Sequence, residues 1–260
     1  MKNRLNHASP IICGLLLLSA AAPLHALDFG DWGRKAEITF SGYKGTETLT
    51  NFPALVVLGP GTITGFAYDD CQAGGADLRF SDSTGLVELP YEIEQWNPAG
   101  DSLVWVRVPE LVDADTSIWA YWGSPVATAP AYTTDGSTWD SNFVAVWHMN
   151  QPSSRDSTAN ALHATSQGTT LDAVGFVGVG QNLNGNYLSV ANNALLNFTS
   201  PGITMSGFAK PNAVGTESAL MRKESQYQLG FYSATMLRPL LATTTTTGTT
   251  RLWSHTPLTP

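Results

Sequence analysis

Alternation between apolar and polar positions predicts short β-strands in the first half of the chain. The segment from Ser102 to Val108 shows the pattern most clearly, because its side chains divide into two sets, Val104, Val106 and Val108 against Leu103, Trp105 and Arg107. Alternate residues of a strand point to opposite faces, so we expect a buried valine face and a second face covered by aromatic side chains. Strands are also predicted over Asp77 to Ser81, Pro90 to Trp96 and Ser117 to Trp122.

The breaks between these segments carry the chemistry of chain reversals. They contain Ser83-Thr84-Gly85, Asn97-Pro98-Ala99-Gly100 and Asp113-Ala114-Asp115. Glycine tolerates positive φ, proline fixes φ, and short polar side chains form local hydrogen bonds, all of which favour turns. Strands joined in this way predict an antiparallel β-module.

A second β-rich unit is predicted after a change of composition. Residues 124–138 are rich in Ser, Pro, Ala and Thr, which is typical of a stiffened linker. A strand is expected over Phe143 to Asn150, and further β-segments over 177–181, 186–190 and 203–211. The predicted fold is therefore all-β, with two antiparallel β-sandwich modules at 27–123 and 139–260 separated by a linker at 124–138, and with no long helix in the mature chain.

Residues 1–26 are predicted to be a secretory signal peptide. Lys2 and Arg4 precede an apolar run from Ile11 to Ala22, and Leu24-His25-Ala26 resembles the short cleavage site, ending in a small residue, that follows such a run. The apolar run is too short for a stable membrane anchor, so no transmembrane segment is expected after cleavage. Cys13 lies before the leucine run and is badly placed for a lipoprotein. We expect an exported protein, whether periplasmic, cell-surface or extracellular.

Charge and cysteine content narrow the possible partners. Cleavage removes two of 13 basic residues and none of 21 acidic residues, so the formal charge moves from −8 to about −10. Because the basic residues are scattered, we expect no nucleic-acid partner. Cys71 is the only cysteine left after cleavage, so an intramolecular disulfide is excluded from the mature chain.

Four blocks in the first unit carry a family resemblance. These are LRFSD, YEIEQWN, VWVRVP and IWAYWG, preceded by Trp32 to Phe40 and Leu49 to Val56. Together, over about residues 32–123, they resemble a bacterial domain of unknown function. That domain occurs before laminin-G-like jelly rolls in large surface proteins and in fusions to proton channels of the biopolymer-transport type. The resemblance implies that the domain lies next to a jelly-roll domain in a protein at the cell surface. It implies no activity.

The second unit resembles a concanavalin A-like jelly roll of the laminin-G type. Its blocks VWHMN, DSTAN, GVGQ and ITMSGFAK follow that order over about residues 139–231. Such a sandwich needs roughly 150 residues, whereas only about 120 remain after Trp139. The end of the chain is a low-complexity, threonine-rich stretch without alternation. We therefore expect an incomplete jelly roll, and a truncated or altered gene product.

Glu92 and Glu94 are the strongest candidates for catalysis. Their i, i+2 spacing on a strand places both carboxylates on one face, with Cα atoms about 7 Å apart. Glycosidases use carboxylate pairs at comparable separations. However, glycosidases with concanavalin-like folds typically carry an E-x-D-x-E strand, and Glu92-Ile93-Glu94-Gln95-Trp96 lacks its central Asp and final Glu. The alternative is a solvated strand face, on which the two pKa values would not split. We predict no catalytic residues and no enzyme activity.

Asp156 is the candidate for a metal ligand. In laminin-G-like folds a loop aspartate can hold calcium, and Asp156-Ser157-Thr158-Ala159-Asn160 offers hard oxygen ligands. The alternative is an Asx turn in which Asp156 and Asn160 bond local amides. Asp69-Asp70 is a weaker candidate of the same kind. Calcium at Asp156 is the only cofactor that the sequence suggests.

Other reactive side chains lack the patterns that their chemistry requires. His148, His163 and His255 have no zinc-type spacing, and no G-x-S-x-G motif is present. Asp69 and Asp70 should disfavour a thiolate at the neighbouring Cys71. Trp119 and Tyr121 share one strand face and could stack on a sugar, although tryptophans more often fill the core of a sandwich.

The sequence thus favours an exported, non-catalytic recognition module. Carbohydrate or another surface glycopolymer is the ligand that the laminin-G resemblance implies, and this fold hosts many functions. A structural part of a cell-envelope assembly, as a relic of a proton-channel or surface-protein fusion, is the alternative, with envelope proteins as partners. A glycoside hydrolase is the third hypothesis.

Overall fold

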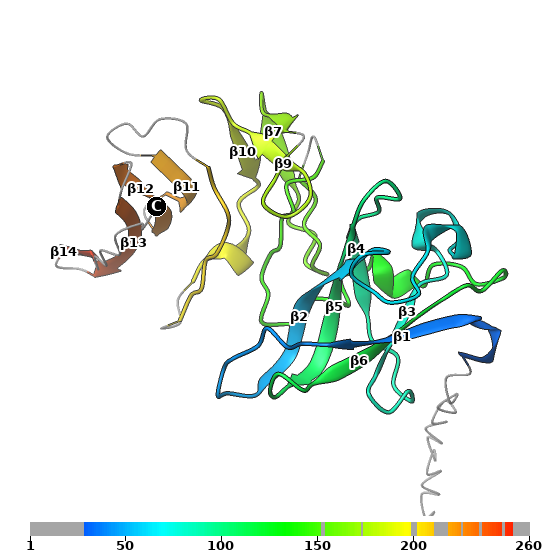
Figure 1. Ribbon diagram of the computed structural model, residues 1–260. Helices are drawn as coiled ribbons and strands as arrows, with labels where there is room; N and C mark the ends of the chain where they lie inside the picture. The colour runs from blue at the N-terminus through cyan, green and yellow to red at the C-terminus, as the bar shows by residue number, and fades with distance from the viewer. Residues whose placement is uncertain are drawn as a thin grey trace, which may run out of the picture.

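The computed structural model describes residues 29–151, 154–172, 174–198, 202–210, 218–224, 226–233, 236–245 and 248–251 (Figure 1). The predicted signal peptide lies outside these residues. Regular structure in them consists of antiparallel strands and five 3-10 turns, so the predicted all-β class is confirmed. The turns are η1 (Phe29–Asp31), η2 (Tyr68–Asp70), η3 (Ala73–Gly75), η4 (Ala131–Thr133) and η5 (Ala194–Leu196). Over the same residues, no helix is long and apolar enough to cross a membrane.

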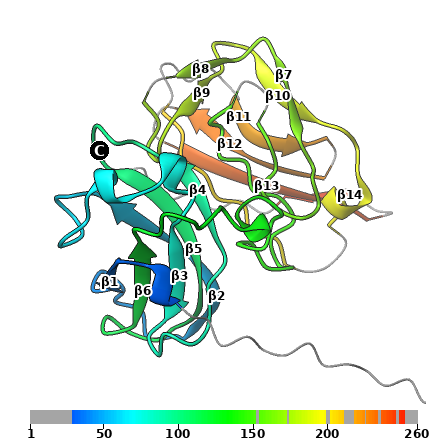
Figure 2. The ribbon, with the colours of Figure 1, turned by 90° about the vertical axis from the view of Figure 1, so that its right-hand side faces the viewer.

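The first unit is a pair of three-stranded antiparallel sheets (Figure 2). One sheet has the order β1-β6-β3, with β1 at Arg34–Thr39, β6 at Ser117–Trp122 and β3 at Arg79–Asp82. The other has the order β2-β5-β4, with β2 at Leu49–Leu58, β5 at Ser102–Leu111 and β4 at Tyr91–Gln95. The core lies between these sheets, and its largest fully buried side chains include Trp122, Tyr91, Phe80, Leu58 and Leu78. Each such side chain contributes roughly 1.5–3 kcal/mol when fully buried.

Strand β5 has the two-faced pattern that its sequence predicts. Val104, Val106 and Val108 are buried in the core, whereas Leu103, Trp105 and Arg107 on the other face are half-buried. The four predicted strands all correspond to observed ones, and Ser117 to Trp122 matches in full. Strand β3 begins two residues later than predicted, at Arg79, because the backbone N–H of Leu78 donates to the carbonyl oxygen of Gly75 in a turn. The carboxylate of the buried Asp77 accepts backbone N–H bonds from Gln72, Gly123 and Ser124.

The first part of the segment predicted as a stiffened linker is anchored to the first unit. The side chain of Gln72 donates to the carbonyl oxygens of Ser124 (2.8 Å) and Ala127 (2.9 Å), and Arg79 donates to that of Thr128 (2.6 Å). Further on, the Tyr132 ring packs edge-on against the buried Tyr91. Polar side chains of the sandwich therefore hold the backbone of residues 124–128, and Tyr132 adds an aromatic contact. The domain boundaries themselves stay a prediction.

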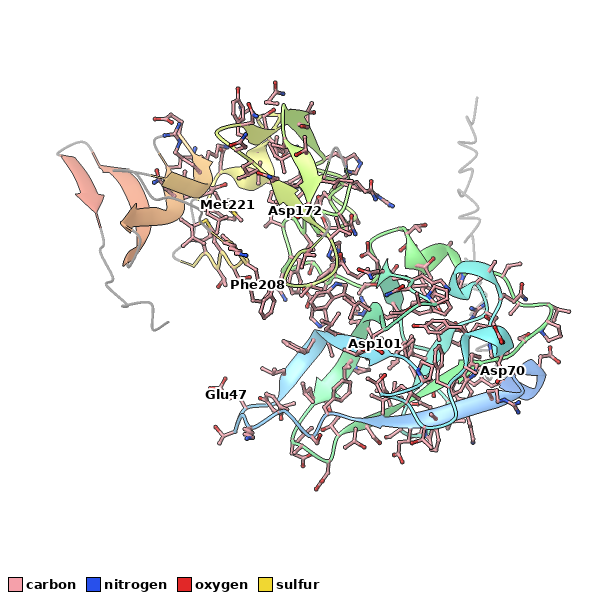
Figure 3. All side chains as sticks on the ribbon, turned by 45° about the horizontal axis from the view of Figure 1, so that its top comes forward. Glu47, Asp70, Asp101, Asp172, Phe208 and Met221 are labelled. Carbon is pink, nitrogen blue, oxygen red and sulfur yellow. The ribbon has the colours of Figure 1, made fainter. Side chains whose placement is uncertain are left out.

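The remaining described strands form three further sheets. The pairs are β7 (Ala164–Gln167) with β10 (Tyr187–Val190), and β8 (Thr170–Asp172) with β9 (Gly180–Asn182). A four-stranded sheet has the order β11-β12-β13-β14, at Ser218–Lys223, Tyr227–Ser233, Met236–Thr245 and Gly248–Arg251. In Figure 3, Asp70 and Asp101 lie in the sandwich, and Asp172, Phe208 and Met221 lie in the part that follows it.

Three predictions for this second part need correction. The threonine-rich stretch lies largely in β13 and β14, because β-branched side chains suit a pleated strand even without alternation. Residues 203–210 have no regular secondary structure. The strand expected at 143–150 is reduced to one bridge between Trp147 and Asp156, since its backbone groups bond to the loop at 154–162 instead and Met149 has a positive φ of 61°.

Candidate functional site

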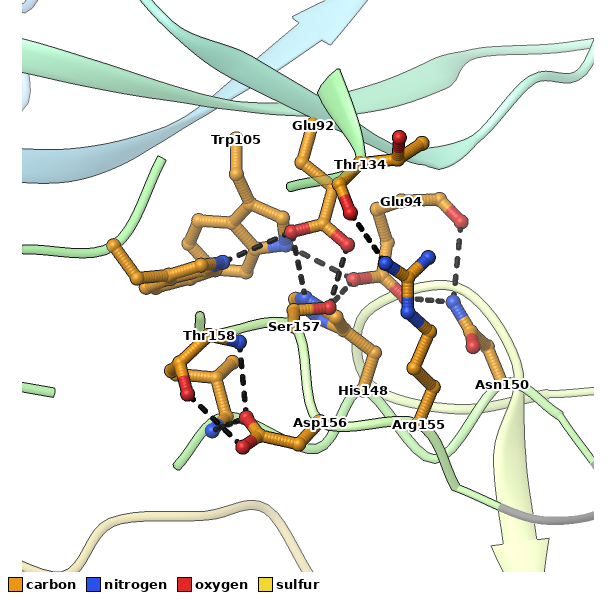
Figure 4. Close-up of polar contacts among 12 residues, drawn as sticks. Glu92, Glu94, Trp105, Thr134, His148, Asn150, Arg155, Asp156, Ser157 and Thr158 are labelled. Carbon is orange, nitrogen blue, oxygen red and sulfur yellow. Dashed lines mark hydrogen bonds and ion pairs between the residues drawn. The ribbon is translucent and has the colours of Figure 1, made fainter. Parts of the chain in front are cut away.

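Glu92 and Glu94 leave strand β4 on its outer face and meet the loop that carries His148 (Figure 4). Strand β4 has a register shift against β5, where Ile93 pairs with Val104 and Gln95 with Leu103, so Glu94 is the extra residue of a bulge. A bulge re-aims side chains at the point where it bends a strand. The expectation that both carboxylates share one face holds, because both contact the same imidazole ring.

The His148 ring lies between the two carboxylates. Its Nδ1 atom pairs with Glu94 Oε2 at hydrogen-bonding distance, and its Nε2 atom lies 3.7 Å from Glu92 Oε2. The side chains of His148 and Glu94 are 9% and 1% exposed, respectively. We call Glu92, His148 and Glu94 the clamp, because they join the sandwich to the chain that follows it.

Other side chains complete the hydrogen bonds of both carboxylates. Glu92 accepts from Ser157 Oγ (2.5 Å) and Trp139 Nε1 (2.9 Å). Glu94 accepts from Trp105 Nε1 (2.9 Å) and Asn150 Nδ2 (3.0 Å). All four carboxylate oxygens therefore accept at least one hydrogen bond, as buried charge requires. The indole rings of Trp139 and Trp105 also lie close to the imidazole, at centroid distances of 5.6 and 6.1 Å.

The clamp holds an imidazolium at neutral pH. Burial alone would lower the pKa of His148, but its contacts with Glu92 and Glu94 outweigh burial and raise that pKa to about 9. For Glu92, burial acts to raise the pKa, yet the His148 imidazolium 3.7 Å away and hydrogen bonds from Ser157 and Trp139 hold it below its usual value. The clamp thus has one cation between two anions.

This arrangement does not fit acid–base catalysis by the two carboxylates. A glycosidase acid needs a pKa raised towards neutrality, and the Glu92 pKa is lowered instead. The carboxylates also meet opposite nitrogens of one ring, so the three groups do not converge on a single point. Among the described residues, no group of three or more His, Cys, Asp or Glu side chains could hold a metal ion.

The solvated strand face considered for Glu92 and Glu94 is wrong, because the Glu94 side chain is buried. The sequence showed the shared face but gave no sign of what covers it. His148 was treated only as a zinc candidate, and its partners come from a strand far away in the sequence. The large aromatic residues Trp105 and Trp139 were the one available signal in the sequence that this face is covered.

Asp156 is buried, at 1% exposure, and its carboxylate accepts four hydrogen bonds. The donors are the backbone N–H groups of Val146, Thr158 and Leu162 and the Thr158 hydroxyl, at 2.8–2.9 Å. The bond to Thr158 N–H closes the Asx turn that was the alternative to an ion. These donors give Asp156 a structural role without calcium, and the calcium site stays a prediction.

The other sequence candidates take up structural positions. Asp70 forms an ion pair with Arg34 at 3.0 Å, and His163 Nδ1 accepts the backbone N–H of Asp156 at 3.1 Å. His255 lies outside the described residues. Burial, followed by the charges of Asp77 and Asp70, raises the pKa of Cys71 to about 12, so a thiolate is disfavoured as expected.

The aromatic pair on strand β6 is covered by other side chains. Phe29 stacks on Tyr121 with ring centroids 3.9 Å apart, and Lys35 Nζ lies 4.7 Å from the ring centroid of Trp119. Tyr121 is buried and is therefore not an open stacking platform. Trp119 is half-buried, and Lys35 lies over one face of its ring.

A small polar pocket of about 130 Å³ adjoins the clamp. It is lined by Glu92, Ile93, Thr133, Thr134, His148, Asn150, Gln151, Arg155 and Ser157. The exposed Arg155 donates from Nη2 to the carbonyl oxygen of Thr134 at its rim. This pocket was not predicted, because its residues come from three separate stretches of the chain.

A family model described as a domain of unknown function (DUF2341) matches residues 74–142. The match covers strands β3 to β6 and includes Glu92, Glu94, Trp105 and Trp139, while His148 lies beyond it. This confirms the resemblance to a domain of unknown function for that part of the chain. No curated protein and no solved structure matches the chain.

The clamp predicts a loss of stability at alkaline pH. The His148 pKa is raised from its ordinary 6.5 to about 9, so its contribution is fully present below about pH 6.5 and is lost as pH rises through about 9. The difference corresponds to about 3 kcal/mol. Thermal unfolding followed between about pH 6 and pH 10 should show the melting temperature falling in the wild type, with a flatter profile in His148→Gln. Equal slopes would assign the titration to another group.

Asp156→Ala should destabilise the protein whether or not calcium is present. The buried N–H groups of Val146, Thr158 and Leu162 lose their acceptor, at a cost of about 3 kcal/mol or more in the free energy of unfolding. Urea unfolding in chelator and in calcium measures this, with the exposed Asp115→Ala as the matched control. Stabilisation of the wild type by calcium that disappears in Asp156→Ala would instead support an ion at this aspartate.

Proposed function

We propose that this protein is a non-catalytic recognition module exported to the cell envelope or beyond. The observation that carries the proposal is that every oxygen of Glu92 and Glu94 already accepts a hydrogen bond from the protein. Carboxylates held in this way fix two parts of the chain together, and they are poorly suited to exchange protons with a substrate. Rigid presentation of a surface is what a binding module needs.

Carbohydrate or another surface glycopolymer is the proposed ligand class. The support comes from the laminin-G-type blocks between about residues 139 and 231 and from the surface-protein setting that the resemblance of the first unit implies. The acidic, export-type composition is compatible with such a role. Under this proposal, the sandwich and the part that follows it act as one recognition unit.

A structural role in an envelope assembly is the second candidate. The clamp supports this role, because its charged groups, shielded by two indole rings, fix the sandwich to the chain that follows it. A structural spacer needs such a stiff connection. A glycoside hydrolase is the least supported alternative, since the Glu92 pKa is shifted in the wrong direction for a general acid.

Binding and turnover on the same set of glycans distinguish these functions. We expect the mature protein to bind one or more plant, algal or bacterial polysaccharides on a glycan array and to hydrolyse none of them. Binding with turnover that Glu92→Gln or Glu94→Gln abolishes would establish an enzyme. No binding to any glycan, with or without calcium, would favour the structural role and contradict the recognition proposal.

A further inference from the structure

The pocket beside the clamp combines charges that balance one another. Glu92, the His148 imidazolium and the Arg155 guanidinium line the pocket. Glu94 lies outside the lining and pairs with His148 Nδ1, so that two negative charges stand against two positive ones around this space. A charged ligand entering this space would therefore meet a like charge at short range. An anion would approach the Glu92 carboxylate, and a cation would approach Arg155 and His148. The balance favours a neutral ligand.

Hydrogen-bonding capacity in the pocket points to hydroxyl groups. Arg155 uses Nη2 for the Thr134 carbonyl, and its other N–H groups donate to no described residue. Ser157 donates its hydroxyl proton to Glu92, which leaves its oxygen lone pairs as acceptors. The Asn150 amide donates to Glu94 and retains its carbonyl oxygen. Donors and acceptors thus lie side by side, and a hydroxyl is a neutral group that can serve as both.

Another polar group at the pocket wall has an incomplete set of bonds. Within the described residues, His148 Nε2 is buried without a hydrogen-bond acceptor, and its nearest carboxylate oxygen, on Glu92, is 3.7 Å away. Buried donors without partners are uncommon in folded proteins and mark places where a polar group can be accommodated.

We propose that this pocket binds vicinal hydroxyl groups of one neutral sugar residue, with Arg155 as the main donor and Ser157 and Asn150 as acceptors. The proposal rests on the recognition function above and adds its site and ligand class. At about 130 Å³ the pocket holds several water molecules or the edge of one sugar ring, but not an oligosaccharide. The site therefore selects a single residue, either terminal or within a chain that passes over the opening.

Titration calorimetry with matched oligosaccharides tests the proposal. The probes are neutral glucose, galactose and mannose oligosaccharides, together with glucuronate-containing and glucosamine-containing ones. We expect a neutral oligosaccharide to bind more tightly than its charged counterparts. Arg155→Leu should weaken that binding by about tenfold or more, which is the loss expected for a hydrogen bond to a charged group. Arg155→Gln, which keeps one donor, should lose less.

Arg222→Leu is the matched control, because Arg222 is an exposed arginine on β11 and lines no part of the pocket. Its binding should equal that of the wild type. If the wild type binds glycans but Arg155→Leu binds them equally well, or if acidic sugars bind best, the pocket assignment is overturned while the recognition function stands. If the wild type binds none of the neutral or charged probes, both fail.

Discussion

A buried imidazolium between two carboxylates is the interaction on which the rest of this structure depends. Ionised groups are costly to remove from water unless they are paired and hydrogen-bonded. Here His148 is paired on both sides, and Trp105 and Trp139 bond to the carboxylates and shield them. The cluster can persist only while strand β4 and the His148 loop stay together, so it fixes the chain that follows the sandwich.

Two further buried carboxylates organise the backbone in a similar way. The Asp77 carboxylate accepts hydrogen bonds from the backbone N–H groups of Gln72, Gly123 and Ser124. These bonds fix the direction that the chain takes after β6, along the sandwich. Asp156 gathers N–H groups from residues on both sides of its loop. These aspartates bring the chain to the position at which His148 reaches Glu94. Some of the acidic residues that outnumber the basic ones therefore have a structural role and do not form a charged surface for a partner.

The sequence was sufficient for the sandwich and insufficient for the clamp, for a physical reason. Alternation such as Val104, Val106 and Val108 is local, because a strand imposes a period of two on its own residues. Two partners of Glu94, His148 and Asn150, lie far along the chain, and Asn150 is 56 positions away, so no local pattern links them to Glu94. The spacing of Glu92 and Glu94 shows that they share a strand face. It does not show that the indole rings of Trp105 and Trp139 and the imidazole ring of His148 cover that face.

The same limit explains the errors in the second part of the chain. Phe143 to Asn150 has the composition of a strand, yet its backbone groups bond to the Asp156 loop, and composition cannot choose between these partners. Conversely, the threonine-rich end lacks alternation but still forms strands, because β-branching alone favours that conformation. The polar pocket lay beyond prediction, since Glu92, Thr134 and Arg155 become neighbours only after the chain has folded.

A double-mutant cycle between His148 and Glu94 tests the central claim most directly. Urea unfolding of the wild type, His148→Gln, Glu94→Gln and the double variant at neutral pH gives the energy of their coupling. A buried ion pair that joins the sandwich to the following loop predicts a coupling of about 2 kcal/mol or more. A coupling below about 0.5 kcal/mol, with the two single effects simply adding, would show that the clamp does not hold these parts together.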